Sequence, residues 1–194
     1  MKICGLTGGV GMGKSTAARF FQSAGAAVVD TDELARELTQ SGQPALAEIR
    51  SVFGRQFIGP DGQLRRAELA RLVFADTIAR RKLEAILHPR IHERWRAQVE
   101  SWRQEGRSLA VVVIPLLFET QAETQFDPIV CVACSAATQH QRLLARGWTP
   151  DQIAGCRSAQ LPADEKIARS HFVIWTEGAL DLHSRQVSQI IGRL

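Results

Sequence analysis

The sequence predicts a three-layer α/β fold with about five parallel strands and a helical insertion. Short, continuously apolar runs alternate with helical patterns towards both ends of the chain, as expected of parallel strands that are covered on both faces. Between the second and third of these runs, apolar residues recur at helical spacing instead. The 194 residues, 45% of them hydrophobic, suffice for one compact α/β unit or for a core with a small inserted lobe.

The first part of the chain predicts two strands and two helices of the core. We expect strands at residues 2–6 and 26–29, a helix at residues 14–24 that ends at Gly25, and a second helix that continues to Leu38. A glycine-rich turn joins the first strand to the first helix. The sequence Asp30-Thr-Asp ends the second strand, so that Thr31 or Asp32 can cap the following helix.

The helical insertion is predicted between residues 44 and 105. Leu46, Ile49 and Val52 illustrate its helical spacing, and Pro60-Asp-Gly predicts a turn within it. Residues 77–105 fit one long helix that is broken or kinked near Pro89, because proline lacks the N–H that a helix interior requires. The insertion therefore separates the second strand of the core from the third.

The second half of the chain returns to alternating strands and helices. We expect strands at residues 109–114, 129–133 and 172–175, and helices at residues 136–146 and 179–193. Thr149 followed by Pro150 predicts another helix start, with a capping side chain before a proline at the first position. No internal repeat or low-complexity segment is present.

Charge and cysteine content narrow the class of protein. A net charge of +4 fits either a solvated basic surface or attraction for phosphate-rich small molecules, and no dense Lys/Arg tract favours nucleic acid. Cys131 and Cys134 form a C-x-x-C, a spacing found in zinc and redox sites, but they lie in an apolar run and we interpret them as buried strand residues. Without a disulfide framework, a reducing cytoplasm is the expected location.

No membrane-spanning segment or signal peptide is predicted. The longest apolar run, at residues 109–118, is about half as long as a membrane helix requires. We therefore expect no membrane partner, while the oligomeric state stays open.

The motif that carries chemistry lies between the first strand and the first helix. Residues 8–15, Gly-Gly-Val-Gly-Met-Gly-Lys-Ser, match the pattern G-x-x-x-x-G-K-[ST] of a P-loop in the strand–helix context that it requires. Its backbone N–H groups and the helix N-terminus bind phosphates, Lys14 reaches the β- and γ-phosphates, and the Ser15 hydroxyl is a ligand of Mg²⁺. The nucleotide contacts that we expect come from Gly9, Gly11, Met12, Gly13, Lys14, Ser15 and Thr16. Mg-ATP is therefore the predicted ligand.

Other features separate the classes of P-loop protein. The chain contains no asparagine, so the Asn-Lys-x-Asp motif by which GTPases recognise guanine cannot occur. The third strand does not end in the acidic pair of motor-type ATPases but leads into Pro115-Leu-Leu-Phe-Glu119. Small size and a helical insertion favour a P-loop kinase fold that acts on a small molecule.

Asp30 and Asp32 form a second group of candidate residues. They follow the second strand, at the edge where open α/β sheets bind ligands. Phosphoryl transfer to an alcohol needs a carboxylate near the attacking hydroxyl, and a second one can help hold Mg²⁺ through water. A turn role for Asp30 and helix capping by Asp32 explain the same spacing equally well.

At this point the sequence resembles the dephospho-CoA kinase family. The opening segments are Thr7–Thr16, which contains the P-loop, and Val29-Asp-Thr-Asp-Glu-Leu-Ala-Arg36. The later pieces agree in order: Asp61-Gly-Gln-Leu-Arg-Arg66, Leu87-His-Pro89, Pro115-Leu-Leu-Phe-Glu119, Gln141-Arg142 with Arg146, and Arg157-Ser-Ala-Gln160. The P-loop alone is generic, but the later pieces together are specific, and the resemblance covers nearly the whole chain.

The resemblance implies transfer of the ATP γ-phosphate to the ribose 3′-hydroxyl of dephospho-CoA, the last step of coenzyme A synthesis. It implies a nucleotide-binding core at residues 1–34, 106–138 and 167–194, a CoA-side insertion at 35–105 and a lid at 139–166. It favours Asp32 over Asp30 as the base.

The resemblance also implies roles for single residues. Arg66, His88, Pro115 and Glu119 become substrate-side or site-shaping residues, and the lid arginines Arg142, Arg146 and Arg157 close over the phosphates. Each has a simpler alternative. His88 can belong to a helix break, Glu119 can be a surface acid, and the arginines can be solvated helix charges.

One stretch departs from the family pattern. The family has Ala-Asp before the last strand and Asn-Gly after it, near the adenine, whereas here Ser170-His171 precedes and Thr176-Glu177-Gly178 follows. The residues by themselves also fit another small-molecule kinase, such as a nucleoside-monophosphate kinase. A P-loop module that binds nucleotide without transferring phosphate fits less well, because it needs neither Asp-x-Asp nor an arginine-rich lid.

Overall fold

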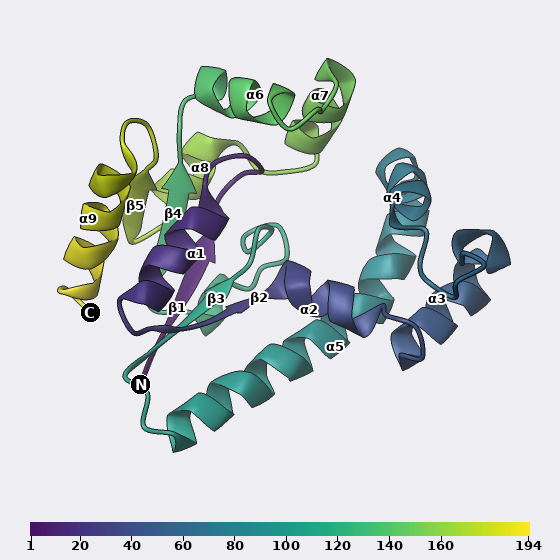
Figure 1. Ribbon diagram of the computed structural model, residues 1–194, viewed down its shortest axis with the longest axis horizontal. Helices are drawn as coiled ribbons and strands as arrows, with labels where there is room; N and C mark the ends of the chain where they lie inside the picture. The colour runs from purple at the N-terminus through teal and green to yellow at the C-terminus, as the bar shows by residue number, and fades with distance from the viewer. The chain divides into compact units, whose positions relative to one another are not determined.

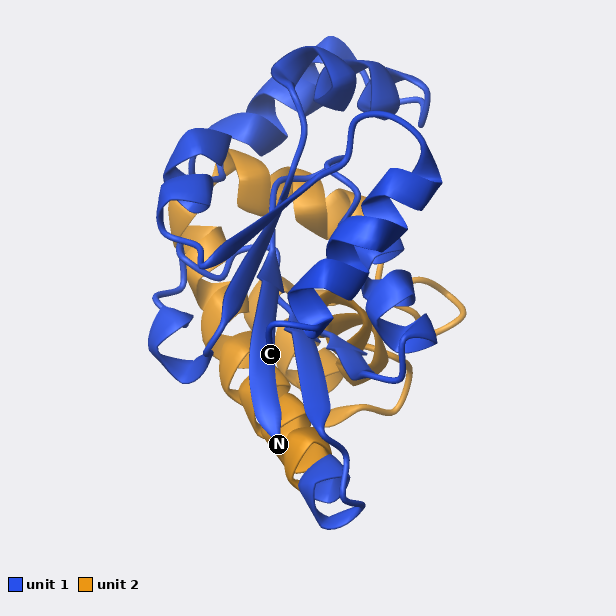
Figure 2. Ribbon diagram, turned by 90° about the vertical axis from the view of Figure 1, so that its left-hand side faces the viewer, with its two compact units in different colours: residues 1–30, 101–194 blue, residues 31–100 orange.

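The computed structural model describes residues 1–194 as a five-stranded sheet and nine α-helices, labelled in Figure 1. The chain forms two compact units, coloured separately in Figure 2. The sheet unit comprises Met1–Asp30 and Ser101–Leu194, and the helical unit comprises Thr31–Glu100. The insertion expected at residues 35–105 overlaps the helical unit, and the expected lid, residues 139–166, lies within the sheet unit.

All five strands are parallel, as the apolar runs predicted. Their order in the sheet is β2-β3-β1-β4-β5, and they comprise β1 (Lys2–Thr7), β2 (Ala27–Asp30), β3 (Leu109–Val113), β4 (Ile129–Ala133) and β5 (Phe172–Trp175). β3 and β4 are buried throughout, which explains why neither shows the alternation of a half-exposed strand. The carboxyl ends of all strands lie at one edge, where the P-loop follows β1.

Helices and loops cover both faces of the sheet. On one face, α1 (Lys14–Ser23) and α9 (Leu180–Ile191) pack on the strands, with Phe21 fully buried. On the other face, α8 (Ala163–Ala168) packs against β4, and Leu117 and Phe126 lie so close to β1 that a Cβ at Gly5 would be 2.8 and 2.9 Å from them. The three predicted layers are therefore present.

The segment between β4 and β5 carries three helices: α6 (Ala136–Leu144), α7 (Pro150–Ser158) and α8. Figure 1 shows α6 and α7 at the end of the sheet towards which the arrow of β4 points. The predicted helix start at Thr149 is confirmed, because its hydroxyl accepts from the Gln152 N–H and the Gln152 side chain accepts from the Thr149 N–H. Pro150 takes the first helical position.

The helical unit has its own core. It contains α2 (Thr31–Leu38), α3 (Pro44–Phe53), α4 (Arg66–Ala75) and most of α5 (Thr77–Gln104). Leu38, Ile49, Leu69 and Ile86 are buried at its centre. α2 begins at Thr31, directly after β2, so that Thr31 and Asp32 lie in the first helical turn and do not precede it as caps. No helix is long and apolar enough to cross a bilayer.

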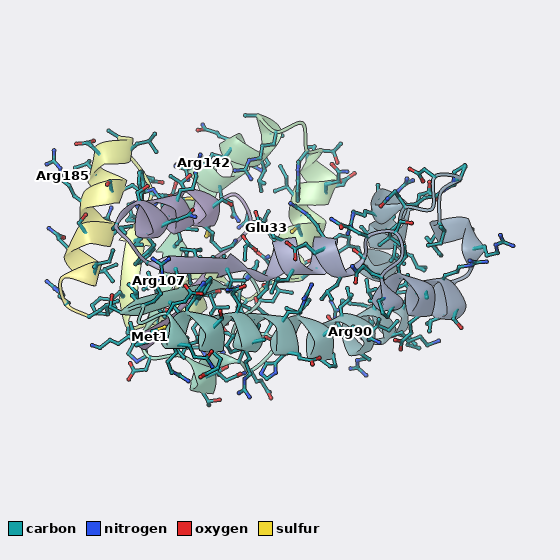
Figure 3. The ribbon with its side chains drawn as sticks, turned by 60° about the horizontal axis from the view of Figure 1, so that its bottom comes forward. Met1, Glu33, Arg90, Arg107, Arg142 and Arg185 are labelled. Atoms are coloured by element: carbon teal, nitrogen blue, oxygen red, sulfur yellow. The ribbon has the colours of Figure 1, made fainter.

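Of the break or kink expected near Pro89, the break does not occur. α5 continues through this residue to Gln104, although proline cannot donate to the carbonyl one turn earlier. The Arg90 guanidinium donates to the Ile86 carbonyl at 2.6 Å and pairs with Glu48 of α3 at 2.7 Å. This side chain, labelled in Figure 3, supplies a hydrogen bond in the turn that the proline weakens.

Candidate active site

The P-loop has a backbone that only glycine permits at several positions. Gly8, Gly11 and Gly13 have φ values of 142°, 74° and 100°, in the region that residues with a Cβ rarely adopt. A Cβ on Gly8 would lie 2.2 Å from the carbonyl oxygen of Val132 in β4, so the loop passes directly against this strand. The loop runs directly into the first turn of α1. Backbone N–H groups of a glycine-rich loop and of a helix N-terminus together bind phosphate.

Lys14 and Ser15 begin α1 at the mouth of this loop. The Lys14 ammonium donates to the carbonyls of Gly8 at 2.8 Å and Gly9 at 3.0 Å, so that it lies over the loop. Ser15 is exposed in the first turn of the helix. A cation, a helix N-terminus and a hydroxyl thus converge on one short segment, as binding of a metal-bound triphosphate requires.

Two glutamine side chains form hydrogen bonds with the backbone of Val10, at the tip of the loop. The Val10 N–H donates to Oε1 of Gln160 at 3.1 Å, and the Val10 carbonyl accepts from Nε2 of Gln139 at 2.8 Å. Gln139 lies on α6 and is 3% exposed, whereas Gln160 follows α7. Neither residue was among the predicted site residues.

The three predicted lid arginines have different surroundings. Arg142 of α6 donates to the hydroxyl of Thr176 at 2.8 Å and to its carbonyl at 2.5 Å, and this hydroxyl donates to the Met12 carbonyl at 2.8 Å. Arg142, labelled in Figure 3, is thereby joined through the loop after β5 to the P-loop. Arg146 is exposed just beyond the end of α6.

Arg157 faces a cavity of about 720 Å³ within the sheet unit. The P-loop, α6, α7 and the end of β5 contribute to its wall, with Gly9, Met12, Gln139, Arg157, Gln160 and Trp175 among the lining residues. An arginine of the predicted lid and the P-loop therefore line the same cavity. Its mixed apolar and polar lining is typical of small-molecule sites.

Glu119 and Pro115 take part in a buried network. The Glu119 carboxylate pairs with the Lys166 ammonium at 2.8 Å, and the same ammonium donates to the Pro115 carbonyl at 2.8 Å. Oε1 of Glu119 also accepts from the Leu161 N–H at 2.8 Å. Lys166 is fully buried, and sequence reasoning missed it because an isolated lysine on a short helix carries no motif. The network ties the loop after β3 to the end of the predicted lid.

Glu177 follows the last strand where the family pattern has asparagine. Its carboxylate accepts from the Ser135 N–H at 2.9 Å, the Thr138 hydroxyl at 2.8 Å and Nε1 of Trp175 at 3.2 Å. These hydrogen bonds, above all those from Ser135 and Thr138, lower the pKa of Glu177 to about 2. The acid therefore joins the loop after β5 to the start of α6.

The predicted acidic pair is divided between the two units. Asp30 is the last residue of β2 and lies in register with Val113 of β3, at the carboxyl edge of the sheet. Asp32 is exposed in the first turn of α2, at the start of the helical unit. The N-terminal end of a helix favours a negative charge there.

Arg66 and His88 both belong to the helical unit. Arg66 begins α4 and donates to the Arg36 carbonyl at 2.9 Å, while burial and the neighbouring Arg36 guanidinium lower the pKa of Arg66. His88 is exposed on α5. The helical unit thus presents a pair of neighbouring arginines, which can bind an anionic substrate.

Cys131 and Cys134 are buried, as the apolar run predicted. Cys131 lies in β4 and Cys134 directly after it. Burial raises the pKa of Cys131 to about 11 and raises that of Cys134 as well. Both thiols therefore stay protonated at neutral pH and behave as small apolar side chains.

Comparison with solved structures shows that the fold is shared with other proteins. A Thermus thermophilus protein of known crystal structure is 31% identical and covers 100% of this chain and 97% of its own, with a TM-score of 0.83. Shikimate kinase from Acinetobacter baumannii, in complex with shikimate, shares the fold with a TM-score of 0.57 at 15% identity, covering 100% of this chain and 94% of that one.

Sequence comparison identifies the family. Residues 2–181 match the family model described as dephospho-CoA kinase. A dephospho-CoA kinase from Syntrophotalea carbinolica is 42% identical over 195 residues, which cover 100% of this chain and 92% of that protein. One from Thiobacillus denitrificans is 42% identical over 204 residues and covers 100% of both chains. With its P-loop, its five parallel strands and these full-length matches, the chain belongs to the dephospho-CoA kinase family of ATP-dependent phosphotransferases.

Proposed function

We propose that this chain transfers the γ-phosphate of ATP to the ribose 3′-hydroxyl of dephospho-CoA, giving CoA and ADP, and that the P-loop binds the triphosphate. The observation that carries this proposal is the glycine-rich loop against β4, with Lys14 over its carbonyls, in a chain that belongs to the family. The reaction takes place in the cytoplasm, where ATP is available. The substrates are small molecules, ATP and dephospho-CoA.

The P-loop residues bind and orient the triphosphate. Lys14 exchanges the carbonyls of Gly8 and Gly9 for the β- and γ-phosphate oxygens, and the N–H groups of Gly9 and of residues 11–16 contact the remaining oxygens. The donor set suits Mg²⁺, because Ser15 provides a hydroxyl oxygen, the kind of ligand that this hard cation prefers. When bound, Mg²⁺ neutralises negative charge on the phosphates.

Asp32 and Asp30 have different roles in the transfer. Asp32, in the first turn of α2, orients the 3′-hydroxyl and accepts its proton. Asp30, at the end of β2, would help hold Mg²⁺ through water. Both assignments follow the family resemblance and the placement of each residue in its own unit.

The remaining predicted residues bind the substrates or shape the site. Arg66 and His88 contact dephospho-CoA, and the neighbouring Arg36 supports binding of its pyrophosphate. Pro115 and Glu119 shape the edge of the site through the network around Lys166. The lid moves over the bound nucleotide, and Arg142, Arg146 and Arg157 then stabilise the charge that spreads during transfer.

A matched pair of substitutions tests the assignment of the base. Asp32→Asn keeps the size of the side chain but cannot accept the proton, so kcat should fall by at least about a hundredfold while the KM for ATP changes little. Asp30→Asn is the control and should mainly raise the Mg²⁺ concentration required. Coupled ADP release and circular dichroism measure activity and folding. A greater loss of kcat in Asp30→Asn than in Asp32→Asn reverses the two roles.

A further inference from the structure

The P-loop tip is held from both sides by side chains of the segment that we propose as the lid. Val10 lies between Gly9 and Gly11, two residues whose backbone is free to rotate in the absence of other constraints. Its N–H and its carbonyl are both occupied by side chains, those of Gln160 and Gln139. We infer that Gln139 and Gln160 are positioning residues for phosphotransfer, which set the direction of the P-loop amides through the backbone of Val10.

The polarity of the two contacts is fixed by chemistry. A backbone N–H can only donate, so Gln160 must present its oxygen, and a carbonyl can only accept, so Gln139 must present its NH₂. One amide side chain is therefore needed as an acceptor and the other as a donor. Glutamine serves both positions, but the two positions differ in what they require.

Each glutamine is itself held in place. Gln139 is 3% exposed on α6, and its Nε2 would lie 3.2 Å from a Cβ on Gly9, so it packs over the loop. Gln160 precedes Leu161, whose N–H is held by Glu119 at 2.8 Å, and Glu119 is paired with the buried Lys166. In this structure the side chains that hold Val10 thus extend from backbone that packs against or hydrogen-bonds to the rest of the sheet unit, which gives the contacts to Val10 a defined geometry.

This arrangement links the loop that orients the γ-phosphate to the segment carrying Arg142 and Arg157. Both glutamines also line the 720 Å³ cavity next to the P-loop, together with Arg157. A displacement of the loop amides by about 1 Å is enough to slow transfer strongly, because the reacting atoms must be aligned. The inference rests on the proposed role of the P-loop as the triphosphate site.

Loss of the polar group at either position should therefore lower kcat. Gln160→Met and Gln139→Met keep the length of the side chain, and each should reduce kcat at least about tenfold with little change in the KM for dephospho-CoA. Since both act through Val10, the double variant should lose much less than the product of the two single losses. Gln189→Met, an exposed position on α9, is the control and should behave as the wild type.

Substitution by glutamate separates positioning from a general structural effect. Gln160→Glu keeps an acceptor oxygen for the Val10 N–H and should retain kcat within about threefold, whereas Gln139→Glu loses the donor and should fall at least about tenfold. Both changes add a carboxyl group near the loop, and the Tm of each variant shows whether burial of the group at position 139 has also lowered stability. Equal kcat losses in the two glutamate variants contradict the inference.

The measurements are kcat and KM for both substrates, together with the Tm of each variant. If a position-139 variant does not fold, the comparison of Gln160→Met with Gln160→Glu is sufficient to test the inference. Equal activity of these two variants overturns it. A wild-type protein that fails to phosphorylate dephospho-CoA instead overturns the proposed function. Wild-type activity that is lost in Lys14→Ala but unchanged in Gln160→Met retains that function and rejects the positioning role.

Discussion

Lys166 shows how a single buried residue can organise distant parts of the chain. Burial of an ammonium is costly unless acceptors surround it. Here the Glu119 carboxylate and the Pro115 carbonyl each lie 2.8 Å from its Nζ, and the Pro115 carbonyl also accepts from the Thr7 hydroxyl at 3.3 Å. One cation therefore joins α8, the loop after β3 and the end of β1, just before the P-loop.

Removal of this cation should destabilise the protein substantially. Lys166→Met leaves the Glu119 carboxylate without its partner in a largely buried position, which we expect to lower the free energy of unfolding by about 3–5 kcal/mol. Adding Glu119→Gln to the same chain removes the uncompensated charge and should recover part of the loss. Urea unfolding followed by circular dichroism measures both. A loss below about 1 kcal/mol in Lys166→Met would mean that the network contributes little.

At the scale of elements, the start of α6 depends on a residue that follows β5. Ser135 caps the helix by accepting from the Thr138 N–H at 3.2 Å. Glu177 then accepts from the Ser135 N–H and from the Thr138 hydroxyl, so that a negative charge lies at the N-terminal end of the helix. α6 carries Gln139 and Arg142, and its placement therefore affects both the P-loop and the proposed lid.

The low pKa of Glu177 predicts a pH-dependent contribution to stability. Its folded-state pKa, about 2, lies below the ordinary value of 4.5, so the stabilisation is fully present above 4.5 and is lost as the pH falls towards 2. Glu177→Gln should therefore lower the Tm at neutral pH, and the difference from the wild type should shrink as the pH falls through this range. Glu165→Gln, an exposed acid on α8, is the control. A difference in Tm that does not change with pH would show that the charge is unimportant.

The proposed lid can be tested as an element by hydrogen exchange. Gly147, with a φ of 80° and no atom within 4 Å of where a Cβ would lie, is between α6 and α7, a suitable place for a hinge. We expect amides of residues 145–162 to exchange more slowly when a non-hydrolysable ATP analogue is bound, because Arg146 and Arg157 then contact the triphosphate. The α9 amides serve as the internal reference. Unchanged exchange in 145–162 would leave these arginines as surface charges.

For the whole molecule, the sequence predicted the parts that depend on local pattern. Continuous apolar runs predicted the buried parallel strands, and the glycine-lysine-serine spacing predicted the P-loop, because both depend on residues that are close in the chain. The partners of Glu119, Val10 and Thr176 were not predictable. Their contacts join residues such as Val10 and Gln160, 150 positions apart, and no periodicity indicates which side chains meet across such a distance.

Pro89 shows a different limit of sequence reasoning. The rule that proline breaks a helix is correct for an isolated helix, but the Arg90–Glu48 pair and the packing of Ile86 hold the turn in place. Tertiary contacts thus overrode a local preference. The assignment of the base to Asp32 and of substrate contacts to Arg66 and His88 rests on the family resemblance and stays a prediction.

At the scale of the molecule, we propose that the helical unit binds the acceptor. Residues 31–100 are more chain than a small acceptor requires, and they present Arg66 beside Arg36 for an anionic group. Binding energy from the pyrophosphate and pantetheine parts of dephospho-CoA can then orient the 3′-hydroxyl for attack. A truncated acceptor such as adenosine should accordingly lose kcat as well as affinity.

The most direct test of this account is the kcat/KM of the purified protein for a panel of acceptors at saturating Mg-ATP. We predict that dephospho-CoA is preferred over AMP, CMP and shikimate by at least about a hundredfold. NMR of the product should show the new phosphate on the ribose 3′-oxygen. Equal or better use of a nucleoside monophosphate, or phosphorylation at another position, would contradict the assignment and leave a P-loop kinase with a different acceptor.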